Sequence, residues 1–557
     1  MNLKSTPPRM NRRLLLGLSA TAVAGTLVGC SSNGGASSDF GKNNSLNTPT
    51  HVDPPEVPGQ VVSDVPGVPP GYTSLPDKLP KSTDGVPGKG GKFTTFQVNW
   101  GAPPRPEGKN KYWQELNKRL GVDYKPTLVP ADAYDDKLAT MISGGDIADM
   151  VFLHTESANA QRAIQDGAFA ELSGVLGGDK IKKYPNLANV PDYQWKASAV
   201  NNGIYGIPVD LAYVNSLHVY RRDWAKKLGF DAEPKNADEF YELMTKMSTT
   251  KLAGRQTYGF GGYTGGVSAF INAMFQVPNN WSEDGGTLSN MIETDEYEQA
   301  LDYTRKLWSG GAFHPDALSL ATQGAKDRGL FNSGVTGWQV ASADTWYRGG
   351  GMQSVREKGG TGADPQLLLP FGQDGGKYAF PSSPGFYAVV AISAEAGSDE
   401  ERLNEILSVM NYLRAPFASE EGFFLRFGIE GVNFSYDKHG APEPITDAAA
   451  NVDVDGLSYT GLVPVAFYYP GDQQAVTDTV RYTESVTKNT VKDPTVGLFA
   501  KSSVKVAPKL EELTTDYVNG IVSGRKPASA LKDFRRKWRN QGGDQLRSEL
   551  EQQLGGR

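Results

Sequence analysis

The sequence has a single cysteine, Cys30, in 557 residues. Intramolecular disulfides are therefore excluded, and the folded part must depend on hydrophobic cores, which a chain of this length can build. The chain is also not basic, because its net charge is −7. This balance argues against a nucleic-acid partner, which requires a basic surface. After residue 30 there is no apolar run of the roughly 20 residues that a transmembrane helix needs.

Motifs for catalysis and metal binding are missing as well. The five histidines are isolated, so there is no HExxH pair, and there is no GxSxG nucleophile elbow. Residues 259–264 begin like a dinucleotide loop but lack its last glycine. Residues 453–456 resemble the start of a calcium loop but lack a Glu at the required distance. We therefore expect no cofactor and no metal.

Cys30 lies where the composition changes abruptly. Arg12 and Arg13 precede an uncharged apolar run, Leu14 to Val28, and small polar residues follow the cysteine. The run has the size of a signal-peptide core, not of a permanent anchor. The order resembles a bacterial lipoprotein signal, and the paired arginines resemble in part a twin-arginine export signal. This predicts a signal peptide over 1–29 and a protein anchored by a lipid on Cys30 at the extracellular face of the membrane. The alternative is a short buried helix with a free core cysteine.

The segment 30–91 is predicted to be a disordered tether. It is poor in apolar residues, and stretches such as 53–59 and 65–70 are too rich in proline for a helix or an inner strand. A chain of this kind has polyproline character and reaches on the order of 50–100 Å. We expect ordered structure to begin at Lys92.

From Lys92 onward the pattern alternates between strands and helices. Trp113, Leu116 and Leu120 share one helical face that Gly121 ends. The expected elements are strands at 93–100, 122–129 and 148–153, one helix that contains 113–120, a second that Asp132 caps and that contains 134–142, and a third at 157–166. Such alternation predicts a parallel α/β sheet, in which ligands bind beyond the carboxyl ends of the strands. After residue 200 the pattern changes, with helices expected near 222–228, 237–247, 295–308, 400–414 and in 505–557.

Five motifs in order resemble the extracellular solute-binding proteins of ABC importers, in the large group that binds sugars and oligosaccharides. Residues 134–151 are similar to the family block Y-x-x-K-L-x-x-M-x-A-S-G-D-x-P-D-x-V. The other four are 202–208, similar to G-x-x-Y-G-I-P; 220–229, similar to Y-x-R-x-D-W-L-x-K-L-G; 236–240, similar to T-x-D-E-F; and 427–431, similar to Y-G-I-E-G. The last motif and residues 542–546 are typical of a longer lipoprotein subgroup that includes binders of uronic-acid oligosaccharides. The calcium loop of the alginate-binding members has no counterpart here, because residues 248–255 contain no carboxylate.

The resemblance implies an α/β architecture of the type II periplasmic-binding-protein class, with two α/β lobes joined by a multi-strand hinge and a ligand cleft between them. The expected division is 92–210 for the first part of lobe 1, 211–377 for the first part of lobe 2, 378–470 for a return to lobe 1, and 471–557 for a helical segment that completes lobe 2 and the hinge. The implied partners are an oligosaccharide and the membrane subunits of an ABC permease, with the protein itself expected to be a monomer and not an enzyme.

Candidate ligand contacts are residues beside turns or at strand ends, because such side chains often face a cleft. We predict that the ligand site contains Trp100, Glu156, Asp210, Tyr213, Trp281, Trp338, Trp346, Arg348, Phe386 and Tyr469. Two alternatives remain open: a binder of peptides or other non-sugar solutes on the same scaffold, and a lipid-anchored glycoside hydrolase, which needs two carboxylates roughly 5–9.5 Å apart.

Overall fold

A computed structural model describes residues 45–554, with gaps at 156, 253, 343–350, 439, 446, 458–463 and 470. The predicted signal peptide and Cys30 lie outside the described residues. Two sheets, each with its own apolar core, organise the chain. We call residues 92–210 and 386–457 the first lobe, and residues 216–381 and 471–554 the second lobe. Within the described ranges, no helix is both long enough and apolar enough to cross a membrane.

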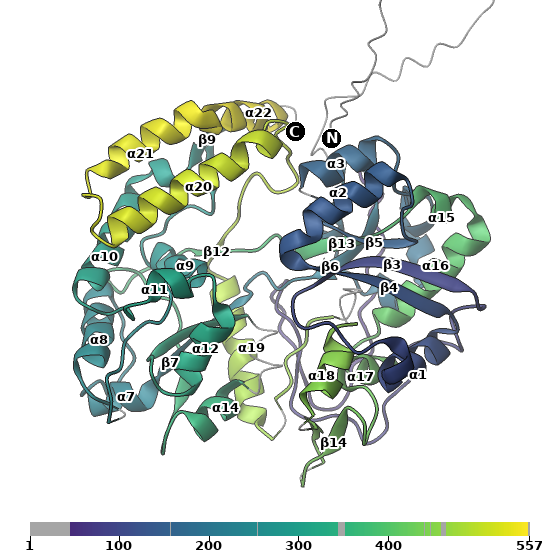
Figure 1. The fold of residues 1–557 in the computed structure, drawn as a ribbon, viewed down its shortest axis with the longest axis horizontal. Helices are drawn as coiled ribbons and strands as arrows, with labels where there is room; N and C mark the ends of the chain where they lie inside the picture. The colour runs from purple at the N-terminus through teal and green to yellow at the C-terminus, as the bar shows by residue number, and fades with distance from the viewer. Residues whose placement is uncertain are drawn as a thin grey trace, which may run out of the picture. The chain divides into compact units, whose positions relative to one another are not determined.

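The first lobe is built on a five-stranded sheet in the order β4-β3-β5-β13-β6. Its strands are β3 (Lys92–Asn99), β4 (Asp123–Pro130), β5 (Met150–Leu153), β6 (Gly206–Asp210) and β13 (Phe386–Ile392). β3 is parallel to β4 and β5, as the alternation predicts, whereas β13 is antiparallel to both of its neighbours. Figure 1 shows β13, coloured green, in a sheet whose other strands are purple to blue, so the chain returns to this lobe from far along the sequence.

Helices surround this sheet and complete its core. They are α1 (Lys111–Leu120), α2 (Tyr134–Gly144), α3 (Ala158–Gln165), α4 (Ser173–Leu176), α5 (Pro185–Ala188), α6 (Asp192–Ser198), α15 (Ala394–Ser398), α16 (Glu400–Leu413), α17 (Glu420–Phe427) and α18 (Ala448–Asp455), with a hairpin of β14 (Phe434–Tyr436) and β15 (Pro442–Pro444). The local sequence explains the ends of α1. The Asn110 side chain accepts the Trp113 N–H at its start, and Gly121 ends it with φ 66°, which favours glycine.

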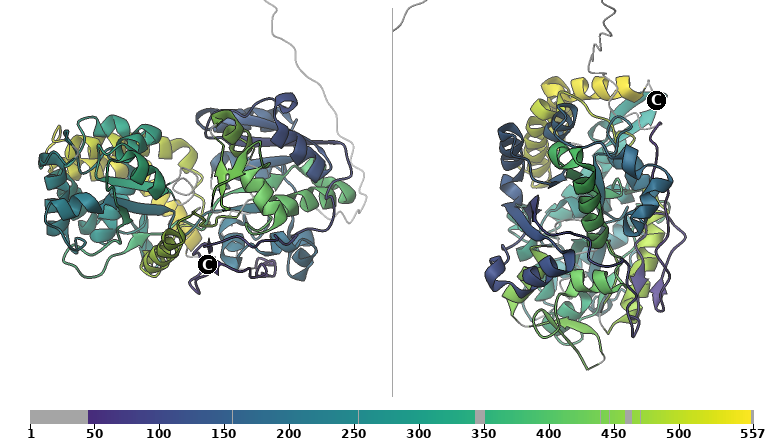
Figure 2. Two further views of the ribbon diagram at one scale, coloured as in Figure 1. Left: turned by 90° about the horizontal axis from the view of Figure 1, so that it is seen from below. Right: turned by 90° about the vertical axis from the view of Figure 1, so that its right-hand side faces the viewer.

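The second lobe has a three-stranded antiparallel sheet, β10-β7-β11. Its strands are β7 (Ser216–Arg221), β10 (Trp338–Ser342) and β11 (Pro365–Leu367), with a separate hairpin of β8 (Trp281–Asp284) and β9 (Thr287–Asn290). Its helices are α7 (Arg222–Lys227), α8 (Ala237–Thr249), α9 (Gly265–Met274), α10 (Asp295–Ser309), α11 (Ala317–Leu320), α12 (Gly324–Asn332), α14 (Gly351–Lys358), α19 (Gln473–Thr487), α20 (Ser503–Val522), α21 (Ala530–Trp538) and α22 (Asp544–Leu554). Figures 1 and 2 show the yellow C-terminal helices beside the teal helices of this lobe, where α20 packs on α10.

The chain passes between the lobes at three places. The first connects β6 to β7, the second connects β12 (Phe380–Pro381) to β13, and the third leads from α18 to α19. β12 pairs in parallel with β16 (Thr490–Val491), so the second connection is fixed to the segment that follows α19. Multiple crossings of this kind form the hinge.

The N-terminal segment 45–91 is not a free tether, which corrects the sequence prediction for these residues. We call it the strap. It forms two short paired strands, β1 (Gln60–Val61) and β2 (Gly71–Tyr72), and is otherwise extended. The proline and glycine content does prevent longer elements, but an extended chain still offers backbone groups and apolar side chains to a protein surface.

The strap contacts the first lobe, then the hinge, then the first lobe again. Near its start, Thr50 N–H donates to Gly178 O at 3.0 Å, and near its end Gly88 N–H donates to Leu120 O at 2.8 Å. Between them, Tyr72 N–H donates to Phe467 O in the third connection at 2.7 Å. Gly67 lies against the hinge at φ 84°, where a Cβ would lie 2.0 Å from the Tyr213 ring. The strap is thus a further segment that lies across the hinge.

Candidate ligand-binding site

The carboxyl edge of the first-lobe sheet brings together residues that are far apart in sequence. β3 ends at Asn99, β5 at Leu153 and β6 at Asp210, and the antiparallel β13 begins at the same edge, with Phe386 opposite Asp210. Parallel strands place their carboxyl ends together, and in open α/β sheets ligands bind at this edge.

Three aromatic side chains form a cluster at this edge. Trp100 is 52% exposed, and its ring centroid lies 6.1 Å from that of Tyr387. The Tyr387 ring lies edge-on to the His154 ring at 5.1 Å, and His154 Nδ1 is 3.2 Å from the Tyr387 carbonyl oxygen. Tyr387 is therefore held by the sheet, and Trp100 packs on it while keeping much of its surface in solvent. The result is an aromatic surface at the strand ends.

A cavity of about 290 Å³ lies at the same edge of the sheet, although none of the three rings lines it. Thr155 and Phe386 line it, and they directly follow His154 and precede Tyr387 in the chain. Residues from both lobes and from the hinge form its walls: Thr155, Gln161, Ala197, Ala199, Val200, Asn279, Asn280, Ser382, Pro384, Phe386, Asp493, Thr495, Val496, Gly497, Leu498 and Phe499. It combines apolar walls with a few amides and hydroxyls, as small-molecule sites usually do.

Two predicted contact residues belong to this region. Trp100 provides the exposed ring, and Phe386 lines the cavity. Glu156, Trp346 and Arg348 lie outside the described residues, so their predicted contacts remain predictions.

Two predicted tryptophans do not face a ligand, and these predictions are wrong. Trp338 is 3% exposed in β10, with its ring centroid 4.8 Å from Phe270 and 5.3 Å from Phe240. Trp281 is buried in β8 and packs on Trp538 at 5.9 Å. Both lie in short strands bounded by turn residues, and the turns, not the tryptophans, are at the surface.

Three further predicted contact residues lie at the hinge and the strap instead of in a common site with Trp100, which corrects the prediction. They are Asp210, Tyr213 and Tyr469. Asp210 accepts a hydrogen bond from Arg414 Nη2 at 2.6 Å in an ion pair. Tyr213 packs on Tyr193 with 4.6 Å between ring centroids, and its backbone N–H donates to Gly67 O of the strap at 3.4 Å. Tyr469 packs against the apolar side chains around α19. Burial raises the pKa of both tyrosines, which therefore stay neutral.

Sequence reasoning did not select several residues that the structure places here. His154 directly follows the strand predicted at 148–153, and Tyr387 is next to the predicted contact residue Phe386. Gln161 and the second-lobe residues Asn279 and Asp493 carry no sequence signal that sets them apart from other polar residues, because only the fold brings them to the cavity.

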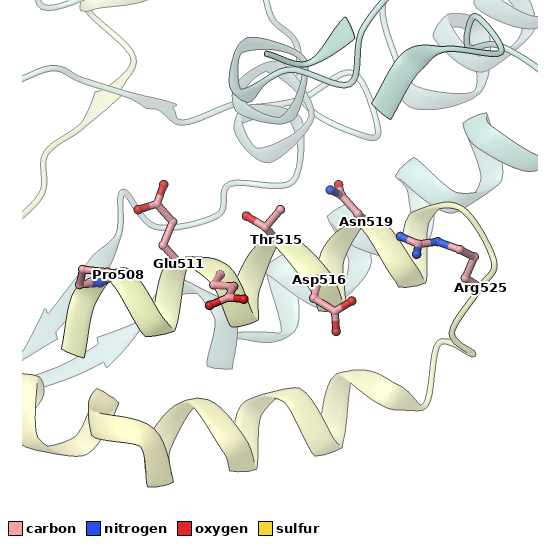
Figure 3. A pocket seen from close by; sticks show the side chains of 7 residues that line it. Pro508, Glu511, Thr515, Asp516, Asn519 and Arg525 are labelled. Carbon is pink, nitrogen blue, oxygen red and sulfur yellow. The ribbon is translucent and has the colours of Figure 1, made fainter. Parts of the chain in front are cut away.

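Two other hollows lie away from the strand ends. One, of about 470 Å³, lies between the strap and the hinge and contains Asp53, Tyr193, Asp210 and Arg414 among its lining residues. The other is an open acidic groove along α20, whose side chains are shown in Figure 3. Among the described residues, no three His, Cys, Asp or Glu side chains gather as metal ligands.

Residues 102–401 match the family model of the bacterial extracellular solute-binding proteins. The chain belongs to this family. Its two α/β lobes and multi-strand hinge are the type II fold that the sequence predicts. The extracellular solute-binding proteins are binding proteins, and the curated relatives below extend the similarity beyond the matched segment.

Two relatives come from Bacillus subtilis. The lipoprotein LipO is 25% identical over 468 residues, which cover 81% of this chain and 89% of LipO. The polygalacturonan/rhamnogalacturonan-binding protein YtcQ is 24% identical over 498 residues, covering 85% of this chain and 94% of YtcQ. Among solved structures, the ABC-transporter substrate-binding protein FusA of S. pneumoniae in complex with kestose has a TM-score of 0.60 and 16% identity, and the match covers 83% of this chain and 98% of FusA. At this identity FusA supports the fold alone.

Proposed function

We propose that this protein is the binding subunit of an ABC importer and that it captures an oligosaccharide at the carboxyl edge of its first-lobe sheet. The single observation that carries the proposal is Trp100, a large apolar side chain that is 52% exposed at the carboxyl edge of the sheet. Apolar surface in contact with water is unfavourable, so an exposed tryptophan at a sheet edge where ligands bind suggests a ligand that covers it.

The chemistry of the site suits a carbohydrate. A sugar has an apolar ring face that stacks on an aromatic plane, and a rim of hydroxyls that bond to amides and hydroxyls. The Trp100–Tyr387 surface provides the plane. Thr155, Gln161 and Asn279 line the cavity at the same sheet edge and provide polar groups. The name of the relative YtcQ, a polygalacturonan/rhamnogalacturonan-binding protein, supports the same ligand class.

The proposed location is the extracellular face of the membrane. The family is extracellular, and the relative LipO is a lipoprotein. We place the lipid on Cys30, which the sequence pattern around the signal peptide supports. The permease would then receive the ligand from a monomeric, membrane-anchored subunit that carries out no chemistry itself.

Binding measurements on a panel of ligands test the proposal. Thermal-shift screening and then calorimetry should detect neutral or acidic oligosaccharides and no peptides, and chromatography should recover each sugar uncleaved. Trp100→Ala should weaken binding about tenfold, since loss of a stacked ring costs about 1 kcal/mol or more. The Tm of the Trp100→Ala variant should change by no more than about 2 °C, because Trp100 is 52% exposed in the folded protein.

Tyr436→Ala is the matched control. Tyr436 is also an exposed aromatic of the first lobe, at 48%, but it lies on the β14–β15 hairpin and does not line the cavity. Its removal should leave affinity unchanged. Binding of peptides alone would favour the non-sugar alternative, and shortened products would favour a hydrolase. Equal affinities of wild-type protein and Trp100→Ala would remove Trp100 from the site.

A further inference from the structure

The 290 Å³ cavity at the carboxyl edge of the first-lobe sheet has a marked charge composition. Asp493 is the only charged side chain among its described lining residues, so no Lys or Arg of the described part of the chain lines it. We infer that the sugar unit held in this cavity is uncharged and that uronates are disfavoured. The inference rests on the proposed carbohydrate binding and specifies its substrate class. It runs against the acidic ligands named for YtcQ and implied by the lipoprotein subgroup.

A buried carboxylate needs a compensating partner. Moving a charged group out of water is strongly unfavourable unless a cation or several hydrogen-bond donors face it. Apolar side chains make up much of the wall, including Val200, Phe386 and Leu498. A uronate placed here would lose its hydration without gaining an ion pair from these walls.

Asp493 makes the cavity less suitable for an anion. Its Oδ1 accepts hydrogen bonds from Thr495 N at 2.8 Å and from Thr495 Oγ1 at 2.6 Å, and its Oδ2 accepts one from Asn280 Nδ2 at 3.0 Å. These bonds fix the aspartate in the wall, with both of its oxygens already accepting hydrogen bonds. A second carboxylate placed beside it would bring two acidic groups together.

Gln161 supplies the second, independent observation. It is 7% exposed on α3 and lines the cavity. Its Nε2 donates to the Thr155 carbonyl oxygen, which can only accept, so the orientation of the amide is fixed. Its Oε1 is buried and has no hydrogen-bond partner among the described residues. A buried acceptor without a donor is unfavourable.

The missing donor identifies the ligand chemistry. A sugar hydroxyl can donate to Gln161 Oε1, whereas an ionised carboxylate has no proton to donate and would face a second acceptor. Three features of the cavity favour a neutral sugar unit that bears hydroxyls. They are the unpaired Gln161 Oε1, the hydrogen-bonded Asp493 and the absence of Lys or Arg among the described lining residues.

Calorimetry on full-length mature protein at pH 7 tests the inference. The panel contains neutral fructo-, gluco-, galacto- and manno-oligosaccharides together with oligogalacturonates and oligomannuronates. The best binder should be neutral. The same oligosaccharide, with its primary alcohols oxidised to carboxylates, should bind at least tenfold more weakly. A uronate as the best binder, or an oxidised sugar that binds as well as its neutral parent, overturns the inference while carbohydrate binding stands. No binding by any carbohydrate refutes the proposed function, and the inference with it.

A variant pair tests the role of the cavity. Gln161→Leu removes the buried acceptor at similar size and should weaken the neutral ligand at least tenfold. Gln165→Leu is the control, because Gln165 is exposed on the same helix. It should change affinity less than twofold. Thermal unfolding shows whether either variant remains folded. Unchanged affinity of a folded Gln161→Leu would overturn the placement of the sugar in this cavity.

Discussion

One buried carboxylate, Glu421, binds residues 82 and 83 of the strap to the first lobe. This residue is 5% exposed on α17 and accepts four hydrogen bonds from the strap. Ser82 donates to Oε2 from its N–H at 2.8 Å and from its hydroxyl at 2.9 Å. Thr83 donates to Oε1 from its N–H at 3.3 Å and from its hydroxyl at 2.9 Å. Glu421→Gln should therefore destabilise the protein and loosen the strap around residues 82 and 83.

The size of the effect follows from these contacts. Hydrogen bonds to a charged group contribute about 1.5–3 kcal/mol each, against about 0.5–1.5 kcal/mol for neutral ones. The glutamine keeps one oxygen acceptor, with weaker bonds, and its NH₂ group faces the two donors of either Ser82 or Thr83. The hydroxyl can rotate away, but the backbone N–H cannot. We expect a loss of about 2–4 kcal/mol in the free energy of unfolding.

Urea unfolding measures the loss, and hydrogen exchange of residues 45–91 shows where it occurs. Glu420→Gln is the control. Glu420 is the exposed neighbour, and its contact with the strap uses its backbone N–H, which donates to Pro80 O at 2.9 Å in either variant. Equal stability of the two variants, or exchange in the strap that matches wild type, would refute this account of strap attachment.

The effect should also depend on pH. Burial by itself raises the pKa of Glu421, but the hydrogen bonds from Ser82 and Thr83 outweigh it, so the pKa lies below its ordinary value. A carboxyl whose pKa is lower in the folded state stabilises the fold above its unfolded pKa of about 4.3, and this contribution is lost as the pH falls through the folded value. The stability difference between wild type and Glu421→Gln should be full at neutral pH and shrink below about pH 4. A stability difference between wild type and Glu421→Gln that stays constant down to pH 3 would contradict the lowered pKa of Glu421.

Three further predictions concern other parts of the chain. Trp338→Ala should lower the free energy of unfolding by about 3–5 kcal/mol because the ring is buried in the second-lobe core; an effect in urea unfolding as small as that of Trp100→Ala would contradict this burial. Asp210→Asn should cost a similar amount, because it leaves the buried Arg414 without its counter-charge; a stable variant would show that the pair is not needed. Cys30→Ser should move the protein from the membrane fraction to the soluble fraction of cells, and a variant that stays with the membrane until detergent is added would rule out the lipid anchor.

Local periodicity predicted the elements of the fold well. The helix expected near 237–247 is α8 (Ala237–Thr249), and the one near 400–414 is α16 (Glu400–Leu413). Both have long apolar faces with Asn236 or Asp399 as the N-cap. Such signals are local and can be read from one sequence. The antiparallel direction of β13 cannot be read from local sequence signals. It depends on where the chain re-enters the sheet after more than a hundred residues.

For the strap, local sequence signals predicted only part of the structure. Its composition predicts the absence of long helices and strands, and this is what the structure contains. Whether an extended segment is bound or free depends on its partners. For Ser82 and Thr83 the partner is Glu421, and for Tyr72 it is Phe467, both hundreds of residues away. Composition reports the lack of regular structure but not the presence of long-range contacts.

For the candidate site, the position at a strand end was the useful signal. Trp100 follows β3 and is exposed, as expected from the carboxyl-edge rule. Proximity to turn residues was a poor signal, because Trp281 and Trp338 also lie near turns but point into cores. The direction of a side chain alternates along a strand, so a shift of one residue decides between core and cleft. Whether a given strand side chain points into the core or the cleft can therefore be predicted only when the register of the sheet is known.

The strap also changes how far the lobes can lie from a membrane. With the lipid anchor proposed at Cys30, a tether that ran to residue 91 would let the lobes move far from the surface. The described contacts begin at Ser45, whose N–H donates to Asn202 Oδ1 at 3.0 Å. Only about 15 residues then separate the anchor from the first lobe, and an extended chain of that length spans about 50 Å at most. If the lipid anchor and the permease are as proposed above, a link of this length would hold the binding site near the permease and raise the effective concentration of the binding protein at the permease.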